Sequence, residues 1–214
     1  MIKVQNLFLS FNKEFYALYN ISLEVEKGRR VALIGEKDSG KTCLLRVLAG
    51  LEQFTSGEAY INGISVKKIN FKTDCNLVYI PKTPILLDNK TVKENLEYVL
   101  KIRKTDSTSI NYKVLSALKN YDIESVKDVK VKELTPFQKM KVQLARASLR
   151  TADLYLIDNV IDDLTYNEQD KILKYLDILL ADNPATFVLA FKAEKLADRY
   201  GARPIKLKFG SIEN

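Results

Sequence analysis

The octapeptide Gly35-Glu36-Lys37-Asp38-Ser39-Gly40-Lys41-Thr42 decides the fold of this chain, because it reads G-x-x-x-x-G-K-T. An apolar run, 31–34, precedes it, and an apolar-periodic segment, Cys43 to Leu48, follows it. A strand before this motif and a helix after it form the setting in which it binds phosphate. Its glycines let backbone N–H groups point at a nucleotide's phosphates, Lys41 reaches the β- and γ-phosphates, and Thr42 offers its hydroxyl to Mg²⁺. The stretch predicts a loop that binds a nucleoside triphosphate through residues 35–43; a chance match in a glycine turn is the plain alternative.

Length and composition predict one α/β domain. The 214 residues, 46% hydrophobic and 29% charged, are ordinary for a globular protein and suffice for one domain with a small insert. No window approaches the roughly 18 to 20 uninterrupted apolar residues of a membrane span, and the N-terminus reads as a strand rather than a signal sequence. Two cysteines, Cys43 and Cys75, are too few and too far apart for a disulfide framework or a zinc site. We therefore expect a reducing, cytosolic setting.

The chain is basic, with 34 Lys and Arg against 27 Asp and Glu and a net charge of +7. Such an excess suits solubility and bound phosphate, an anionic membrane surface or a nucleic acid. The lysines are dispersed and lack interleaved aromatic stacking motifs, whereas a nucleic-acid footprint needs clustered basic residues. Solubility and bound phosphate are the favoured interpretation.

The hydrophobic patterning predicts an order of elements along residues 1–214. Period-2 alternation predicts antiparallel strands near the N-terminus, and alternating strands and helices predict α/β units near the C-terminus. Between them, residues from about 86 to 150 have helical spacing and predict a helical subdomain inserted in the core. The predicted strands are 2–9, 17–25, 30–34, 57–61, 64–66, 76–80, 153–158, 186–190 and 204–208, and the predicted helices are 43–48, one or more within 91–121, 136–149, 167–180 and 193–200.

This order of parts resembles the nucleotide-binding domain of ABC transporters over essentially the whole chain. The resemblance is carried by the phosphate loop and by short runs at matching spacing. It implies an α/β, P-loop NTPase fold of the ABC type, with an N-terminal antiparallel β subdomain, an inserted helical subdomain, and ATP and Mg²⁺ as ligands. The matching runs are Leu48-Ala49-Gly50-Leu51, Thr55-Ser56-Gly57-Glu58, Ile61-Asn62-Gly63 and Thr91-Val92-Lys93-Glu94-Asn95.

The resemblance assigns two further binding residues. Phe11 lies where the family has the aromatic residue that stacks on adenine, with Phe15 and Tyr16 as rivals and a buried strand aromatic as the plain alternative. Asp158 ends the apolar strand 153–158, as the Walker B carboxylate does, and is expected to hold Mg²⁺ together with Thr42.

The catalytic positions of the family are occupied by other residue types. Asn159 stands where a glutamate polarises the attacking water, and an amide cannot accept a proton near neutral pH. Lys192 stands where a histidine contacts the γ-phosphate, and the chain has no histidine at all. Lys82 stands where a glutamine faces the metal, which its charge would repel. We therefore expect no intact catalytic residue.

Two binding loops depart from the family as well. The signature LSGGQ reads Leu134-Thr135-Pro136-Phe137-Gln138, in which Pro136 has no N–H and Phe137 adds bulk where phosphate would approach. Asp38 replaces a common glycine of the phosphate loop; aspartate tolerates left-handed backbone, but its charge would weaken phosphate binding if it pointed inward.

Together these replacements predict an ATP-binding subunit of an ABC transporter that binds Mg-ATP and hydrolyses it slowly or not at all. The resemblance implies a membrane permease and a second ATP-binding subunit, in a homodimer or a heterodimer, as partners. It also implies a cytoplasmic location, peripheral on the cytoplasmic face of the membrane. An active ATPase compensated by its partner is the alternative. A regulatory domain acting on nucleic acid or a soluble assembly is the least favoured hypothesis.

Overall fold

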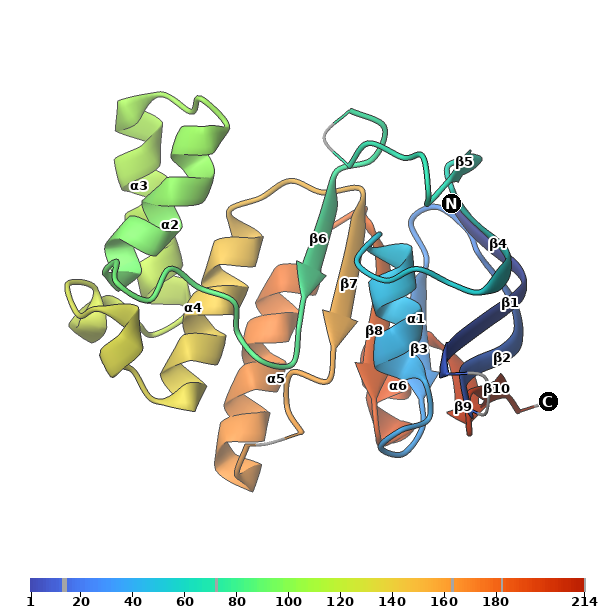
Figure 1. Ribbon diagram of the computed structural model, residues 1–214. Coiled ribbons are helices and arrows are strands. Elements are labelled where there is room, and N and C mark those ends of the chain that lie inside the picture. Colours follow the sequence, from blue (N-terminus) through green and yellow to red (C-terminus); the bar gives the residue numbers. More distant parts are fainter. Residues whose placement is uncertain (13–14, 72, 163, 182, 214) are drawn as a thin grey trace. The chain divides into compact units, whose positions relative to one another are not determined.

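The computed structural model describes residues 1–12, 15–71, 73–162, 164–181 and 183–213 (Figure 1). The chain divides into two units, each built from separate segments of sequence. The first comprises Met1–Tyr79, Ala152–Asn159 and Pro184–Asn214, and the second comprises Ile80–Thr151 and Val160–Asn183.

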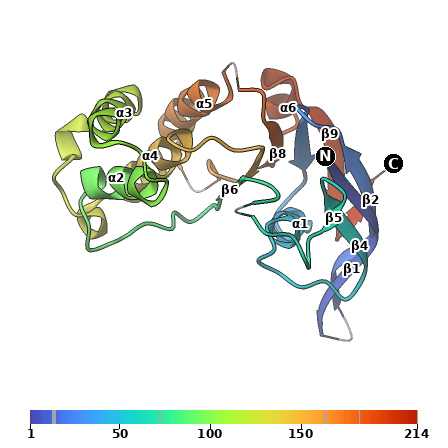
Figure 2. The ribbon, with the colours of Figure 1, turned by 90° about the horizontal axis from the view of Figure 1, so that it is seen from above.

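The first unit begins with an antiparallel sheet of order β2-β1-β4-β5 (Figure 2). Strands β1 (Ile2–Asn12) and β2 (Phe15–Val25) pair along most of their length, and β1 also pairs with β4 (Ser56–Ile61). Between β4 and β5 (Ile64–Ser65), Asn62 and Gly63 have φ values of 52° and 78°. Positive φ at both central residues is what a tight hairpin turn requires, and β4 and β5 pair antiparallel on either side of it.

The phosphate loop follows the central strand of a six-stranded sheet of order β10-β9-β3-β8-β7-β6. Strand β3 (Arg30–Ile34) pairs in parallel with β8 (Thr186–Phe191) and with β9 (Arg203–Lys208). Because a parallel strand is covered on both faces, it needs the continuous apolar run that β3 has. The remaining elements are α1 (Lys41–Leu48), β6 (Leu77–Ile80), β7 (Leu154–Asp158), α6 (Lys195–Arg199) and β10 (Ser211–Ile212).

The second unit is helical. Helix α2 (Val92–Ile102) begins with a capping box, in which Thr91 Oγ1 accepts from Glu94 N and Glu94 Oε2 accepts from Thr91 N. The next residue, Asn95, is fully buried and binds backbone groups of the loop before the helix, at Leu87 and Thr91. The other helices are α3 (Ser107–Asn120), η1 (Glu124–Val126), η2 (Val131–Glu133), α4 (Pro136–Ser148) and α5 (Tyr166–Leu180).

The structure differs from the sequence prediction mainly at short elements. Strand β10 was not predicted, because two residues are too few to show a period. The predicted helical range 91–121 is two helices, separated where Lys104 adopts a left-handed φ of 54° and Asp106 caps α3. Helix α6 is shorter at both ends than predicted, by the one or two residues over which helix boundaries commonly vary.

None of the helices in the described ranges has the length and apolar character needed to cross a lipid bilayer.

Candidate phosphate-binding site

The loop between β3 and α1 has the backbone geometry that its sequence predicts. Gly40 is the N-cap of α1 with a φ of 97°, and Asp38 adopts a left-handed φ of 63° with an exposed side chain. Aspartate is among the few residues that tolerate this conformation. The loop is held in place by hydrogen bonds from Gly35 N to Phe191 O, 3.3 Å, and from Gly210 N to Ser39 O, 3.2 Å.

Lys41 is buried inside this loop, with 3% of its surface exposed. Its Nζ donates to Gly35 O at 2.6 Å, to Glu36 O at 2.8 Å and to Ser39 Oγ at 3.0 Å. These acceptors hold the ammonium group at the N-terminus of α1, where the helix dipole also favours an anion.

Thr42 and Asp158 meet although they are far apart in sequence. Thr42 Oγ1 donates to Asp158 Oδ1 at 3.0 Å, and Asp158 is 1% exposed at the end of β7. Tyr79 OH, from β6, donates to the other carboxylate oxygen, Asp158 Oδ2, at 3.1 Å. A hydroxyl and a carboxylate are oxygen ligands of the kind that Mg²⁺ takes, so this pair fits the metal that the sequence predicts.

Asn159 follows Asp158 in an unusual conformation. Its φ is 45°, its N–H donates to Ala190 O at 3.2 Å, and it is 8% exposed. Its Oδ1 is buried and has no hydrogen-bond partner within the described part of the chain. An unpaired buried acceptor is costly, and its presence beside the phosphate loop is typical of a site that a water molecule or a ligand completes.

Lys192 lies next to the phosphate loop and forms an ion pair with it. Its Nζ is 3.2 Å from Glu36 Oε2, and both side chains are largely exposed. Both residues line a cavity of about 630 Å³, together with Lys37, Asp38 and the exposed ring of Phe209. A positive side chain thus lies beside the phosphate loop, where a carboxylate pairs with it.

Phe11 is exposed, with 65% of its surface accessible, so it is no core aromatic of the strand. The strand that contains Phe11, β1, pairs with β2, where Leu9 lies opposite Leu18. Strand β2 in turn packs closely on the phosphate loop, because a Cβ on Gly40 would lie 2.7 Å from Ala17 O. The rivals Phe15 and Tyr16 are exposed as well, but Tyr16 packs edge-on against Phe8 and Tyr19.

The signature segment and Lys82 belong to the second unit. Helix α4 starts with Pro136 and is closed by a capping box of its own. Thr135 Oγ1 accepts from Gln138 N at 3.2 Å, and Gln138 Oε1 accepts from Thr135 N at 2.9 Å. Two backbone donors of this terminus are therefore occupied and a third, that of Pro136, does not exist.

Tyr79 is a site residue that the sequence analysis missed. No motif in the sequence links it to a carboxylate 79 positions away. The available signal was its place in a short strand that ends at Pro81, in a sheet whose neighbouring strand ends in Asp158.

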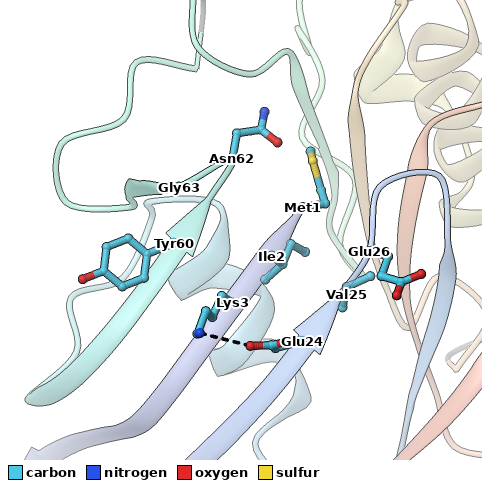
Figure 3. Close-up of a pocket in the computed structure, with 9 residues that line it drawn as sticks. All are labelled: Met1, Ile2, Lys3, Glu24, Val25, Glu26, Tyr60, Asn62 and Gly63. Atoms are coloured by element: carbon cyan, nitrogen blue, oxygen red, sulfur yellow. Dashed lines mark ion pairs between the residues drawn. The ribbon is translucent and has the colours of Figure 1, made fainter.

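A second cavity, of about 380 Å³, lies where β1 begins and β2 ends (Figure 3). The ion pair between Lys3 Nζ and Glu24 Oε1, 3.3 Å, crosses it. The chain runs from Val25 into the start of β3, whereas the phosphate loop follows the end of β3. This cavity is therefore separate from the phosphate-binding site.

Replacing Gly40 by alanine is expected to destabilise the chain more than the same change at Gly63. Both glycines have positive φ, and a side chain there costs about 1 to 2 kcal/mol in either place. A Cβ at Gly40 would also lie 2.7 Å from Ala17 O, whereas a Cβ at Gly63 meets nothing within 4 Å. Urea unfolding of both variants measures the difference, and equal costs would contradict the close packing of the loop on β2.

Known proteins are similar to this chain in sequence. The ABC transporter family matches residues 18–162. The spermidine/putrescine import ATP-binding protein PotA of Legionella pneumophila is 30% identical over 214 residues, which are 100% of this chain and 58% of that protein. The sn-glycerol-3-phosphate import ATP-binding protein UgpC of Bartonella quintana is 32% identical over 166 residues, which are 77% of this chain and 47% of that protein. The chain spans about half the length of the curated relatives it matches.

Solved structures share its fold. A dimer of the ATP-binding cassette MJ0796 bound to ADP and inorganic phosphate superposes with a TM-score of 0.84 and 26% identity, over 100% of this chain and 97% of that one. The predicted α/β fold of the P-loop ABC type is thereby confirmed. The family match over residues 18–162 agrees with the structure, which places Thr42 of the phosphate loop beside Asp158. This chain belongs to the ABC transporter family, as an ATP-binding domain.

Proposed function

We propose that this chain binds Mg-ATP as the ATP-binding subunit of a transporter and hydrolyses it slowly or not at all. It acts as a nucleotide-responsive or scaffolding half rather than as an efficient motor. The observation that carries this proposal is Asn159, a buried amide at the position directly after the metal-binding carboxylate Asp158.

The residues proposed to contact ATP and Mg²⁺ are present in the chain, which supports nucleotide binding. Residues 35–43 surround the phosphates, Lys41 neutralises their charge, and the exposed ring of Phe11 stacks on the adenine. Thr42 and Asp158, 3.0 Å apart, hold Mg²⁺. When bound, the metal neutralises triphosphate charge.

The groups that cleave the nucleotide are missing. The amide oxygen of Asn159 can accept a hydrogen bond from water, but it cannot take up a proton near neutral pH. Lys192 carries a positive charge to the γ-phosphate position but has no acceptor nitrogen while it is protonated, and Glu36 pairs with it. The chain contains no histidine that could take this role.

The signature segment also argues against efficient turnover by a pair of such subunits. In a head-to-tail pair, the N-terminus of α4 faces the nucleotide of the opposite subunit. Here Thr135 and Gln138 occupy each other's backbone donors, and Pro136 has none to offer. A capping box satisfies a helix N-terminus without an external anion. The trans phosphate contact is therefore lost along with the general base.

The partners we propose are a membrane permease and a second ATP-binding subunit, either another copy of this chain or a related one. Both curated relatives are import proteins by name, and we propose the same direction here. The chain would lie on the cytoplasmic face of the membrane. There, the second unit exposes large apolar side chains suited to contact with a permease. They are Ile85, Tyr98, Ile102, Tyr112 and Leu115.

Measuring nucleotide binding and turnover on the same preparation tests this function. The purified chain is expected to bind a fluorescent ATP analogue in a Mg²⁺-dependent manner and to release phosphate at a rate near background, alone and with its permease. Removal of Mg²⁺ with a chelator should weaken binding. Brisk hydrolysis by the unmodified protein would favour the compensated ATPase instead, and salt-sensitive binding to DNA or RNA would favour the regulatory domain.

A further inference from the structure

The hydrogen bond from Tyr79 to Asp158 is a contact of the candidate phosphate-binding site that the proposed function does not use. The Tyr79 hydroxyl donates to Asp158 Oδ2 at 3.1 Å, while Thr42 Oγ1 donates to Asp158 Oδ1 at 3.0 Å. Each oxygen of this buried carboxylate thus accepts a hydrogen bond, one from α1 and the other from the neighbouring strand β6.

The phenol hydroxyl of Tyr79 is the donor in this hydrogen bond, and the carboxylate oxygen of Asp158 is the acceptor. A protonated phenol that donates to a carboxylate oxygen occupies one of its lone pairs and fixes the rotation of the carboxylate. Asp158 is 1% exposed, so few water molecules compete for that oxygen.

We infer that Tyr79 orients Asp158 to bind a cation through one oxygen and thereby makes the site favour Mg²⁺ over Ca²⁺. Tyr79 acts through Asp158 and is a positioning residue. The inference rests on the proposed function, because it needs a divalent cation bound with the nucleotide.

The preference follows from how the two ions are coordinated. Mg²⁺ requires near-octahedral geometry with short bonds and takes carboxylates through one oxygen, whereas Ca²⁺ accepts more ligands and commonly binds both oxygens of a carboxylate. The hydrogen bond from Tyr79 takes up one lone pair of Oδ2 and disfavours an orientation of Asp158 in which both oxygens bind one ion. Without the phenol hydroxyl, this constraint on Oδ2 is gone, and binding of both oxygens to the larger ion becomes easier.

The test compares the chain with its Tyr79→Phe variant, which keeps the ring and removes only the hydroxyl. A fluorescent ATP analogue at fixed concentration is titrated with Mg²⁺ or with Ca²⁺, and the ratio of the two apparent affinities is compared between variants. We expect the preference for Mg²⁺ to fall about tenfold, the effect of losing one hydrogen bond to a charged group. Metal-free binding of the analogue is expected to stay the same, whereas a purely structural role would lower it too.

Two controls keep the result interpretable. Tyr166→Phe removes a hydroxyl from a tyrosine that is 83% exposed at the start of α5 and is expected to leave the ratio unchanged. In an Asp158→Asn background, Tyr79→Phe should have no effect on the ratio, because the carboxylate through which it acts is gone. An unchanged ratio in a wild-type chain that binds the nucleotide with metal overturns the role of Tyr79 alone. Absence of metal-dependent binding in the wild-type chain overturns the proposed function and this inference with it.

Discussion

Replacing Lys41 by methionine is expected to weaken nucleotide binding about a hundredfold, the loss of one or two hydrogen bonds between charged groups. The Lys41 ammonium is buried and donates to Gly35 O, Glu36 O and Ser39 Oγ, so it is fixed at the N-terminus of α1, where we propose that the phosphates bind. Methionine fills a similar volume but removes the charge and leaves these three acceptors without their donor. Titration of a fluorescent ATP analogue measures the effect.

Lys37 provides a matched control in the same loop. Its side chain is exposed, so Lys37→Met removes the same charge without removing a buried donor. We expect its nucleotide affinity to change by less than about threefold, the effect of a screened surface charge. Similar losses in both variants would mean that general electrostatic attraction, not the geometry of Lys41, holds the nucleotide. Thermal melting of both variants checks that the fold survives.

The local structure of the candidate phosphate site could be predicted from the sequence because its parts are close together in the chain. A strand, a glycine loop and a helix within residues 30–48 are enough to place Lys41 and Thr42, and the apolar strand that ends in Asp158 is visible by itself. The left-handed backbone of Asp38 could also be foreseen, since few other residues tolerate it.

Contacts between distant segments could not be predicted in the same way. Tyr79 reaches Asp158 only because β6 lies beside β7 in the sheet, and the pair between Glu36 and Lys192 depends on the end of β8 lying beside the phosphate loop. Neither contact has a spacing in sequence that marks it. The orphaned amide oxygen of Asn159 is likewise a property of packing, whereas the residue type itself was readable from the sequence.

Restoring a glutamate at position 159 is expected to destabilise the protein without restoring hydrolysis. Asn159 has a left-handed φ of 45°, which asparagine tolerates better than glutamate does, and it is 8% exposed beside the buried Asp158. A second carboxylate there loses its hydration and meets a like charge. We expect Asn159→Glu to cost about 3 kcal/mol in the free energy of unfolding, as unpaired buried charges do.

The Asn159→Gln variant separates the effect of the charge from that of the backbone strain. Glutamine has a side chain as long as that of glutamate and must adopt the same left-handed φ, but it carries no charge. It is expected to cost about 1 kcal/mol, so the difference between the two variants measures the buried charge. Burial and the like charge raise the pKa of the new carboxyl in the folded state, so its proton is held more tightly there than in the unfolded chain. The extra cost therefore grows as pH rises from the ordinary glutamate pKa of about 4.3 to the raised pKa and levels off above it, which urea unfolding from about pH 8 to about pH 5 measures. Phosphate release should stay near background in both variants, because Lys192 and the self-capped α4 are unchanged. A stable Asn159→Glu variant that hydrolyses ATP briskly would contradict this account and identify Asn159 as the only obstacle to catalysis.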